Sequence, residues 1–296
     1  MNPRVIADYK NIVGEGPLWH PQEKRLYWGD ILGGKLFRYD PDTSGHEMFF
    51  EGQVIGGFTI QTDGSQLLFM EYGKIAILTA SGDLSTVIER LPGEEKSRFN
   101  DVIADPFGRV FCGTMALDDK DAMSKRVTGK LYRLDTDGTI TELLDGIGIS
   151  NGLGFTPDRK QMYYTDSIAN AIYIFDYDEA SGDISNQRIF VSTPDADHEG
   201  MPDGMTVDGQ GFVWSARAGG GKLVRYSPDG EEDRTVHFPT ANIVSSVTFG
   251  GPDMTDIFVT TIGGDNRPEA GTEAGSLFQL NLGIVGVPDF ESRIGL

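Results

Sequence analysis

The stretch SNGLGFTPDRKQMYYTDSIANAIYIFDYDEASGDISNQRIFVS, residues 150 to 192, contains four short apolar segments separated by turn sequences. The segments are GLGF, MYYTD, AIYIFD and QRIFVS, and the sequences between them include PDRK, SIAN and EASGD. Segments of this length, with turn residues between them, are typical of antiparallel strands joined by hairpins. The stretch therefore predicts one four-stranded antiparallel sheet.

The same unit recurs along the whole chain. Its most apolar segment appears as LYWGD from Leu26, LLFME from Leu67, VFCGT from Val110, MYYTD from Met162, FVWSA from Phe212 and IFVTT from Ile257. The first residues of these segments are 41, 43, 52, 50 and 45 residues apart. Four strands repeating with a period of about 40 to 50 residues are typical of a β-propeller, with one blade per repeat. We therefore predict an all-β, six-bladed β-propeller of four antiparallel strands per blade, formed by residues 1–296 as a single domain.

The last repeat lacks a fourth strand, because the C-terminal sequence LNLGIVGVPDFESRIGL is interrupted by glycine and proline. A matching segment, RVIADY from Arg4 to Tyr9, precedes the first repeat. We expect this N-terminal strand to complete the sixth blade and to close the ring. Several independent β-sandwiches are the alternative, but nothing resembling a linker separates the repeats.

Charge and cysteine content exclude several classes of protein. The chain has 45 acidic and 25 basic residues and a formal net charge of −20, which repels nucleic acid and anionic lipid headgroups. Cys112 is the only cysteine, so neither an internal disulfide nor a cysteine-based metal site can form. No apolar run is long enough for a signal-peptide core or a membrane-spanning helix. We expect a cytoplasmic protein with neither a nucleic-acid nor a membrane partner.

One position of the repeat carries most of the candidate functional residues. In a propeller the innermost strand of each blade lines the central channel, so equivalent residues converge around its axis. Counting back about ten residues from each apolar segment gives six positions, called the ring positions below: Glu15, Gly56, Asn100, Asn151, Asp203 and Ser246. Carboxylate and amide oxygens suit Ca²⁺, Mg²⁺ or Mn²⁺, and carboxylates also bind Zn²⁺. The ring positions therefore predict a site for a divalent cation on the channel axis.

One argument supports this prediction, and the sequence also permits an alternative. Two carboxylates converging on a narrow axis would repel each other unless one took up a proton, and a divalent cation removes that conflict. Asn151-Gly152 and Asp203-Gly204 have an alternative interpretation as ordinary turn dipeptides. No GxSxG or HExxH motif is present, so the sequence supports neither a serine hydrolase nor a zinc hydrolase of the HExxH type.

The motifs GEGPLW, RFNDV with GTMA downstream, SNGLGF and PDGMTVD occur in this order over nearly the whole chain. In this arrangement the sequence resembles the family of senescence marker protein, regucalcin and gluconolactonase. The resemblance implies a six-bladed propeller with lactonase activity and one divalent metal ion. We expect Ca²⁺ at this site, with Zn²⁺, Mn²⁺, Mg²⁺ and Fe²⁺ as alternatives. The resemblance also implies metal ligands at Glu15, Asn151 and Asp203, and substrate contacts at Arg98 and Asn100.

An acidic substrate contact follows GTMA in that family, and the resemblance matches it to Asp118. Relatives often have glutamate there, and a polar insertion, Asp118 to Gly129, follows in this chain. For Arg98 the alternative is a surface residue paired with Glu94 or Glu95.

The predicted chemistry is hydrolysis of a sugar (aldono)lactone to the aldonic acid. The metal would act as a Lewis acid, and Asp203 would serve as the general base that activates water. Two alternatives stay open: a phosphotriesterase-like hydrolase that uses the same metal site, and a calcium-binding propeller without enzymatic activity.

Overall fold

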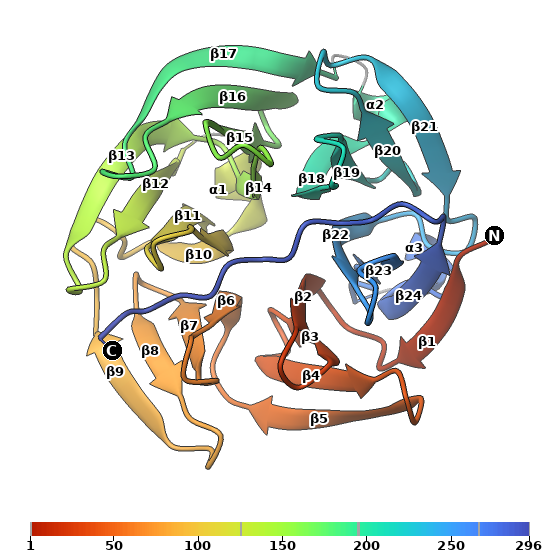
Figure 1. Cartoon of the computed structure of the whole chain (residues 1–296), viewed down its shortest axis with the longest axis horizontal. Helices are drawn as coiled ribbons and strands as arrows, with labels where there is room; N and C mark the ends of the chain where they lie inside the picture. Colours follow the sequence, from red (N-terminus) through yellow and green to blue (C-terminus); the bar gives the residue numbers. More distant parts are fainter. Residues whose placement is uncertain (1, 125, 194–195, 266, 296) are drawn as a thin grey trace.

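The computed structural model describes residues 2–124, 126–193, 196–265 and 267–295. Its strands form six four-stranded antiparallel sheets arranged around a central channel, so the predicted six-bladed β-propeller is confirmed (Figure 1).

The first five blades each consist of four strands that are consecutive in the sequence. Blade 1 consists of β2 (Gly14–His20), β3 (Arg25–Asp30), β4 (Lys35–Asp40) and β5 (Gly45–Glu51). Blade 2 consists of β6 (Ile55–Ile60), β7 (Gln66–Met70), β8 (Ile75–Leu78) and β9 (Leu84–Ile88), and blade 3 of β10 (Ser97–Ala104), β11 (Val110–Ala116), β12 (Gly129–Leu134) and β13 (Ile140–Ile147). Blades 4 and 5 consist of β14 (Ser150–Phe155), β15 (Gln161–Asp166), β16 (Ala171–Tyr177) and β17 (Ile184–Ser192); and β18 (Met201–Val207), β19 (Val213–Ala218), β20 (Lys222–Tyr226) and β21 (Glu232–His237).

Blade 6 is built from both ends of the chain. It contains β22 (Val244–Gly250), β23 (Asp256–Thr261), β24 (Ser276–Asn281) and, as its outermost strand, β1 (Arg4–Asp8). In the antiparallel pair of β1 and β24, Arg4 lies opposite Gln279 and Ala7 opposite Leu277. The prediction that the N-terminal strand closes the ring is therefore confirmed.

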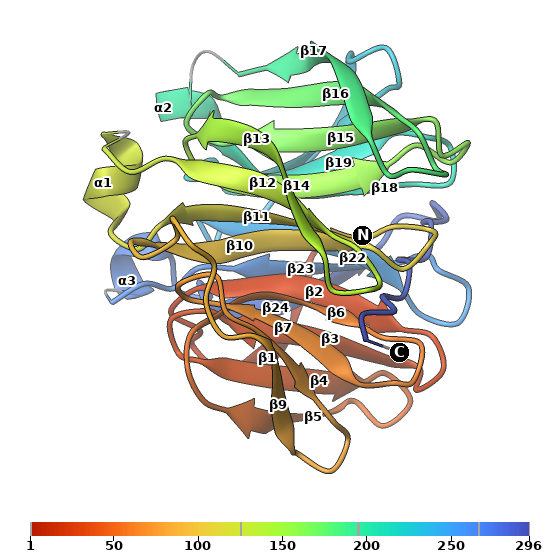
Figure 2. The ribbon, with the colours of Figure 1, turned by 90° about the vertical axis from the view of Figure 1, so that its left-hand side faces the viewer.

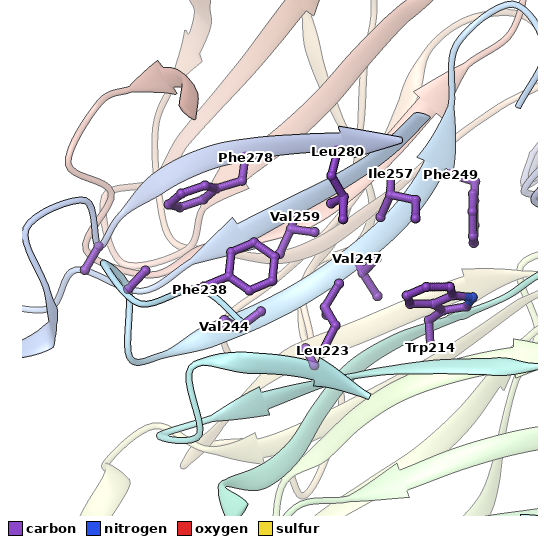
Figure 3. Close-up of a cluster of buried hydrophobic side chains, with 13 residues drawn as sticks. Trp214, Leu223, Phe238, Val244, Val247, Phe249, Ile257, Val259, Phe278 and Leu280 are labelled. Atoms are coloured by element: carbon purple, nitrogen blue, oxygen red, sulfur yellow. The ribbon is translucent and has the colours of Figure 1, made fainter. Parts of the chain in front are cut away.

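The hydrophobic core lies between neighbouring blades. All five residues of β7 are buried, whereas most of β5 is exposed, because inner strands are covered on both faces and outermost strands on one. Figure 3 shows one such core, in which Trp214 and Leu223 of blade 5 pack with Val247 and Phe249 of blade 6. Burial on both faces explains why the second strand of each repeat is the most continuously apolar segment of the sequence.

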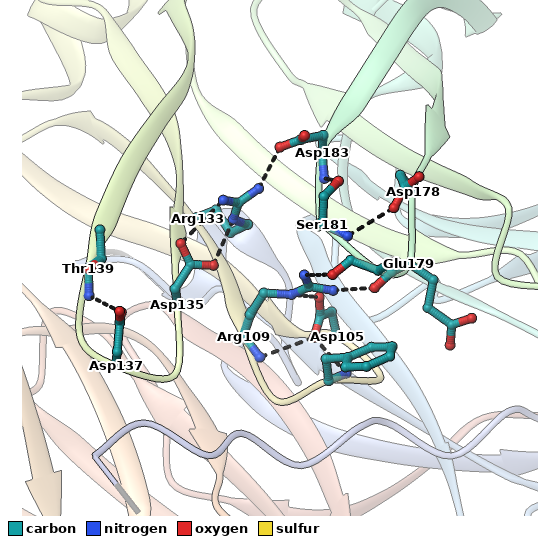
Figure 4. A network of polar contacts seen from close by, with 12 residues as sticks. Asp105, Arg109, Arg133, Asp135, Asp137, Thr139, Asp178, Glu179, Ser181 and Asp183 are labelled. Carbon is teal, nitrogen blue, oxygen red and sulfur yellow. Dashed lines mark hydrogen bonds and ion pairs between the residues drawn. The ribbon is translucent and has the colours of Figure 1, made fainter.

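A buried polar network ties blade 3 to blade 4 (Figure 4). Asp105 accepts hydrogen bonds from Arg109 Nε at 2.5 Å and from the Tyr177 hydroxyl at 2.8 Å. Arg109 Nη2 also donates to the carbonyl oxygen of Glu179 at 2.6 Å. Because the buried charges are paired and hydrogen-bonded, the hairpin loops of the two blades are held together without an unpaired buried ion.

The two faces of the ring differ. The helices α1 (Asp119–Met123), α2 (Ala196–Glu199) and α3 (Arg267–Ala270) lie on the face where the innermost strands begin, and the C-terminus lies on the opposite face (Figure 2). None of the helices in the described part of the chain has the length and apolar character needed to span a membrane.

Residues 283–295, called the strap below, cross the channel on the face opposite the helices (Figure 1). At one end the Gly209 amide donates to the Val285 carbonyl oxygen at 2.8 Å. At the other end the Ser292 amide donates to the Ile60 carbonyl oxygen at 2.9 Å, and the Arg293 amide donates to that of Gly108 at 2.9 Å. The strap therefore links blades 5, 2 and 3.

The strap places one carboxyl group inside the channel. Asp289 lines a cavity of about 480 Å³ and accepts a hydrogen bond from Thr248 Oγ1 at 3.2 Å. Burial raises the pKa of Asp289 from 3.8 to about 6. A carboxyl group whose pKa is higher in the folded protein than in the unfolded chain stabilises the fold only while it holds its proton. This contribution is lost as the pH rises from about 4 to about 6.

Replacing Asp289 with asparagine should therefore stabilise the protein at pH 8. The pKa change corresponds to at most about 3 kcal/mol, and solvent reaching the carboxyl through the cavity lowers the expected gain to about 1–2 kcal/mol. Urea unfolding at pH 8 and at pH 4.5 should show a gain that shrinks at the lower pH. The same substitution at the exposed Asp253 serves as the control. A gain of equal size at both pH values would contradict the argument.

Candidate functional site

The innermost strands bring the ring positions together through a shared irregularity. Each of these six strands has a β-bulge or register shift at or beside its ring position, between the pairs Glu15/Leu18, Ile55/Gly57, Phe99/Val102, Asn151/Leu153, Pro202/Met205 and Val244/Ser246. A bulge changes the direction of the side chains beside it. Asn151-Gly152 and Asp203-Gly204 lie inside β14 and β18, so their interpretation as turn dipeptides is wrong.

Glycines beside the ring positions let neighbouring blades approach closely. A Cβ atom on Gly152 would lie 2.7 Å from the carbonyl oxygen of Asp203, and one on Gly204 would lie 2.2 Å from Ser246 Oγ. Both distances are too short for a carbon atom, so a side chain at either position would push two blades apart. The candidate ligands of blades 4 and 5 are thus close because no Cβ separates their strands.

A chain of hydrogen bonds crosses the site from blade 3 to blade 5. Arg98 Nη1 donates to Asn100 Oδ1 at 2.6 Å, and Asn100 Nδ2 donates to Asn151 Oδ1 at 2.6 Å. Asn151 Nδ2 donates to Ser167 Oγ at 2.8 Å, and Ser167 Oγ donates to the Pro202 carbonyl oxygen at 2.6 Å. All of these side chains are less than a tenth exposed. Both amide groups are therefore held in one orientation.

The two carboxylates among the ring positions share one electrostatic environment. Glu15 and Asp203 are each 5% exposed, and the Gly16 amide donates to Glu15 Oε2 at 3.1 Å. Burial, then the negative charges of Asp203 and Asp101, raise the pKa of Glu15 well above its usual range. Burial, then the charge of Asp101, raise the pKa of Asp203 in the same way, while Arg98 lowers both. Without a cation, this arrangement disfavours two ionised carboxylates.

Asp101 is a member of the site that the sequence analysis missed. Burial raises its pKa to about 7, and the charge of Arg98 opposes that rise. Asp101 lines the cavity between the innermost strands and the strap, and Ser246 is the only one of the six ring positions among the residues that line it. Its neighbour Asn100 also belongs to the site, although consecutive strand residues normally point to opposite faces. The bulge between Phe99 and Val102 explains how both reach the channel.

The predicted substrate contacts have different surroundings. Arg98 is only 8% exposed, so its interpretation as a surface residue paired with Glu94 or Glu95 is wrong. Glu94 is itself buried and accepts a hydrogen bond from the Tyr132 hydroxyl at 2.6 Å. Asp118 is exposed and is the N-cap of α1, where its carboxylate accepts the Lys120 amide hydrogen at 2.8 Å. Its predicted contact with substrate stays a prediction.

The donor set of the site fits a hard divalent cation. It contains two carboxylates, Glu15 and Asp203, and the amide oxygens of Asn151 and Asn100, which already accept hydrogen bonds from Asn100 Nδ2 and from Arg98 Nη1. Among the described residues, no group of three or more His, Cys, Asp and Glu side chains is arranged to hold a metal ion. A cation at the ring would therefore depend on the amide oxygens as well as on the two carboxylates, which is typical of Ca²⁺ sites. Neighbouring negative charges contribute to the raised pKa values of Glu15 and Asp203. A bound cation would offset this repulsion.

Comparison with known proteins identifies one family model, several relatives and solved structures to which the chain is similar. The family model described as SMP-30/Gluconolactonase/LRE-like region matches residues 13–263. Pentonolactonase XacC of Haloferax volcanii is 46% identical over 298 residues, which cover 98% of both chains. The 6-deoxy-6-sulfogluconolactonase of Pseudomonas putida is 33% identical over 259 residues, covering 87% of this chain and 86% of the relative. The crystal structure of a calcium-binding protein, regucalcin, from Agrobacterium tumefaciens has a TM-score of 0.88 and 25% identity, with 98% of this chain and 97% of that chain covered.

Proposed function

This chain belongs to the SMP-30/gluconolactonase/LRE-like family, and from that premise we propose that it is a metal-dependent hydrolase of sugar lactones. The substrate class is an aldonolactone and the product is the corresponding aldonic acid. The observation that carries the proposal is the convergence of Glu15, Asn100, Asn151 and Asp203, from four different blades, on one buried site. The names of the pentonolactonase and sulfogluconolactonase relatives support the choice of substrate class.

Glu15, Asn151 and Asp203 are the proposed ligands of one divalent cation, with Asn100 beside them. Two carboxylates balance the charge of the cation, and Ca²⁺ is the first candidate because hard oxygen donors dominate the site. When bound, the cation would supply Lewis-acid polarisation of the lactone carbonyl and neutralise the charge that develops on its oxygen.

Asp203 is the proposed general base. Its carboxylate takes a proton from the attacking water as the water oxygen bonds to the carbonyl carbon. The ring carbon–oxygen bond then breaks, and the departing ring oxygen takes up the proton that Asp203 received, so that it becomes a hydroxyl group and Asp203 is again a carboxylate. Because the Asp203 side chain is buried, its carboxylate is kept away from bulk water, which strengthens its interactions.

Arg98 and Asn100 are the proposed substrate contacts. Their mutual hydrogen bond at 2.6 Å orients both groups before substrate binds. A guanidinium group suits a sugar hydroxyl or a ring oxygen because it only donates hydrogen bonds. Asp118 remains a proposed third contact, and to reach a substrate its carboxylate would have to leave the α1 amide groups.

Acid release measured in a pH-stat tests this function. The panel would contain aldonolactones of five and six carbons and one neutral organophosphate, each with added Ca²⁺, Zn²⁺ or Mn²⁺ and after chelation. We expect metal-dependent acid release from at least one aldonolactone. Release from the organophosphate alone would favour a phosphotriesterase-like enzyme, and metal binding without any hydrolysis would favour a calcium-binding propeller.

Replacing Glu15 with glutamine should weaken Ca²⁺ binding by at least about tenfold, because one of two charged ligands becomes neutral. Calorimetric titration of the metal-free protein, together with metal analysis after mild dialysis, measures the change. Asp289→Asn is the matched control, since it also removes a carboxylate from the channel but at the end closed by the strap. Unchanged affinity and stoichiometry in Glu15→Gln would show that Glu15 is not a ligand.

A further inference from the structure

Each of the three proposed metal ligands follows a backbone carbonyl group that is held by the preceding blade. Ser245 of blade 6 donates to the Gly14 carbonyl oxygen at 2.6 Å, directly before Glu15. Asn100 of blade 3 donates to the Ser150 carbonyl oxygen at 2.8 Å, directly before Asn151. The same relation holds in a third place, where Ser167 of blade 4 donates to the Pro202 carbonyl oxygen at 2.6 Å, directly before Asp203.

The two serines are enclosed in the protein. Ser245 is 0% exposed and Ser167 is 2% exposed. Ser245 Oγ also lies 3.0 Å from Thr260 Oγ1 of its own blade, which holds the hydroxyl in place. A buried carbonyl group that loses its donor costs about 1–3 kcal/mol, so each hydroxyl opposes separation of the two strands it joins.

Ser167 has a second effect, on the orientation of the Asn151 amide. A hydroxyl group has a single hydrogen, and Ser167 gives it to the Pro202 carbonyl, which can only accept. Ser167 therefore offers only lone pairs to Asn151, so it selects the amide nitrogen, found at 2.8 Å. The amide oxygen of Asn151 is thereby turned toward Asn100 and the ring positions.

We propose that Ser167 and Ser245 are positioning residues of the metal site. They act between blades: Ser245 sets the backbone before Glu15, and Ser167 sets both the backbone before Asp203 and the amide of Asn151. Metal ligands must lie within about 0.2 Å of their ideal distances, so blade spacing at these carbonyl groups controls affinity. This inference rests on the proposed function, because it assumes that the ring binds a cation.

The test is Ca²⁺ affinity, measured by calorimetric titration of metal-free protein without substrate. Ser167→Ala and Ser245→Ala should each weaken binding by about 10- to 100-fold, the usual effect of removing a group that orients a metal ligand. Ser167→Thr keeps the hydroxyl and should recover most of the affinity. Ser215→Ala is the matched control, since Ser215 is equally buried but bonds within its own blade, to the Ala216 carbonyl oxygen.

Thermal unfolding of the same variants separates positioning from ordinary stabilisation. A positioning role predicts that Ca²⁺ raises the melting temperature of Ser167→Ala and Ser245→Ala less than that of the unsubstituted protein and of Ser215→Ala. Lower metal-free stability with unchanged Ca²⁺ affinity in both variants would overturn the inference. Failure of the unsubstituted protein to bind any divalent cation would instead reject the proposed metal site itself.

Discussion

Asp203→Asn should reduce turnover of the best aldonolactone by at least about 100-fold, the usual effect of losing a general base. Asparagine keeps an oxygen donor but cannot accept the proton of the attacking water. The variant should bind metal more weakly and yet be fully loaded at high metal concentration, so the assay is made at saturating metal. Asp203→Ala removes the ligand oxygen as well, and its turnover should fall to near background.

Arg98→Ala is the comparison that separates the two roles. Its guanidinium group is not a ligand, so metal affinity should fall less than in Asp203→Asn, whereas KM should rise because substrate orientation is lost. The missing hydrogen bond to Asn100 Oδ1 would add a smaller loss of kcat. If metal-saturated Asp203→Asn were fully active, Asp203 would not be the base, and Asp101 and Asp118 would be the next carboxylates to replace.

Deleting residues 1–9 should destabilise the protein by more than about 4 kcal/mol, beyond the effect of most single substitutions. The deletion removes β1 and leaves β24 as an unpaired edge strand. It also removes Tyr9, whose ring lies 4.4 Å from that of Phe37 in blade 1 and so joins blade 6 to blade 1. Thermal and urea unfolding of the metal-free protein measure the loss.

Deletion of residues 2 and 3 alone is the control for this experiment, because both precede β1. That shorter deletion should leave the free energy of unfolding within about 0.5 kcal/mol of that of the full chain. Equal stability of the two deletions would mean that β1 and Tyr9 contribute little to closure. Contacts between the inner strands of blades 6 and 1, such as the hydrogen bond from Ser245 to the Gly14 carbonyl oxygen, would then hold the ring closed.

The blades and the ring positions could be predicted because their signals are local and repeated. Each strand of a repeat has its own pattern of apolar residues. Counting back about ten residues from the most apolar segment of each repeat gives an equivalent position beside the channel. Glu15, Asn100, Asn151 and Asp203 were found in this way and do lie together in the structure. The N-terminal strand was expected over Arg4 to Tyr9 and forms over Arg4–Asp8.

Asp101 and Ser167 could not be found in this way. Asp101 follows Asn100 directly, and strict alternation would point it away from the channel, but a β-bulge changes its direction. Ser167 lies in the turn after β15, and its acceptor, the Pro202 carbonyl, is 35 residues away along the chain. Neither the β-bulge nor the distant acceptor can be recognised from the residues next to Asp101 or Ser167 in the sequence.

The number of blades, the closing strand and the residue types at the ring therefore follow from the sequence, because hydrophobic periodicity acts over a few residues and is repeated six times. The β-bulges, the approach of Gly152 to Asp203 and the course of the strap across the channel were decided only in the folded ring. These features depend on distances between blades that are remote in sequence. They are set by packing and by hydrogen bonds between blades, which a local pattern does not record.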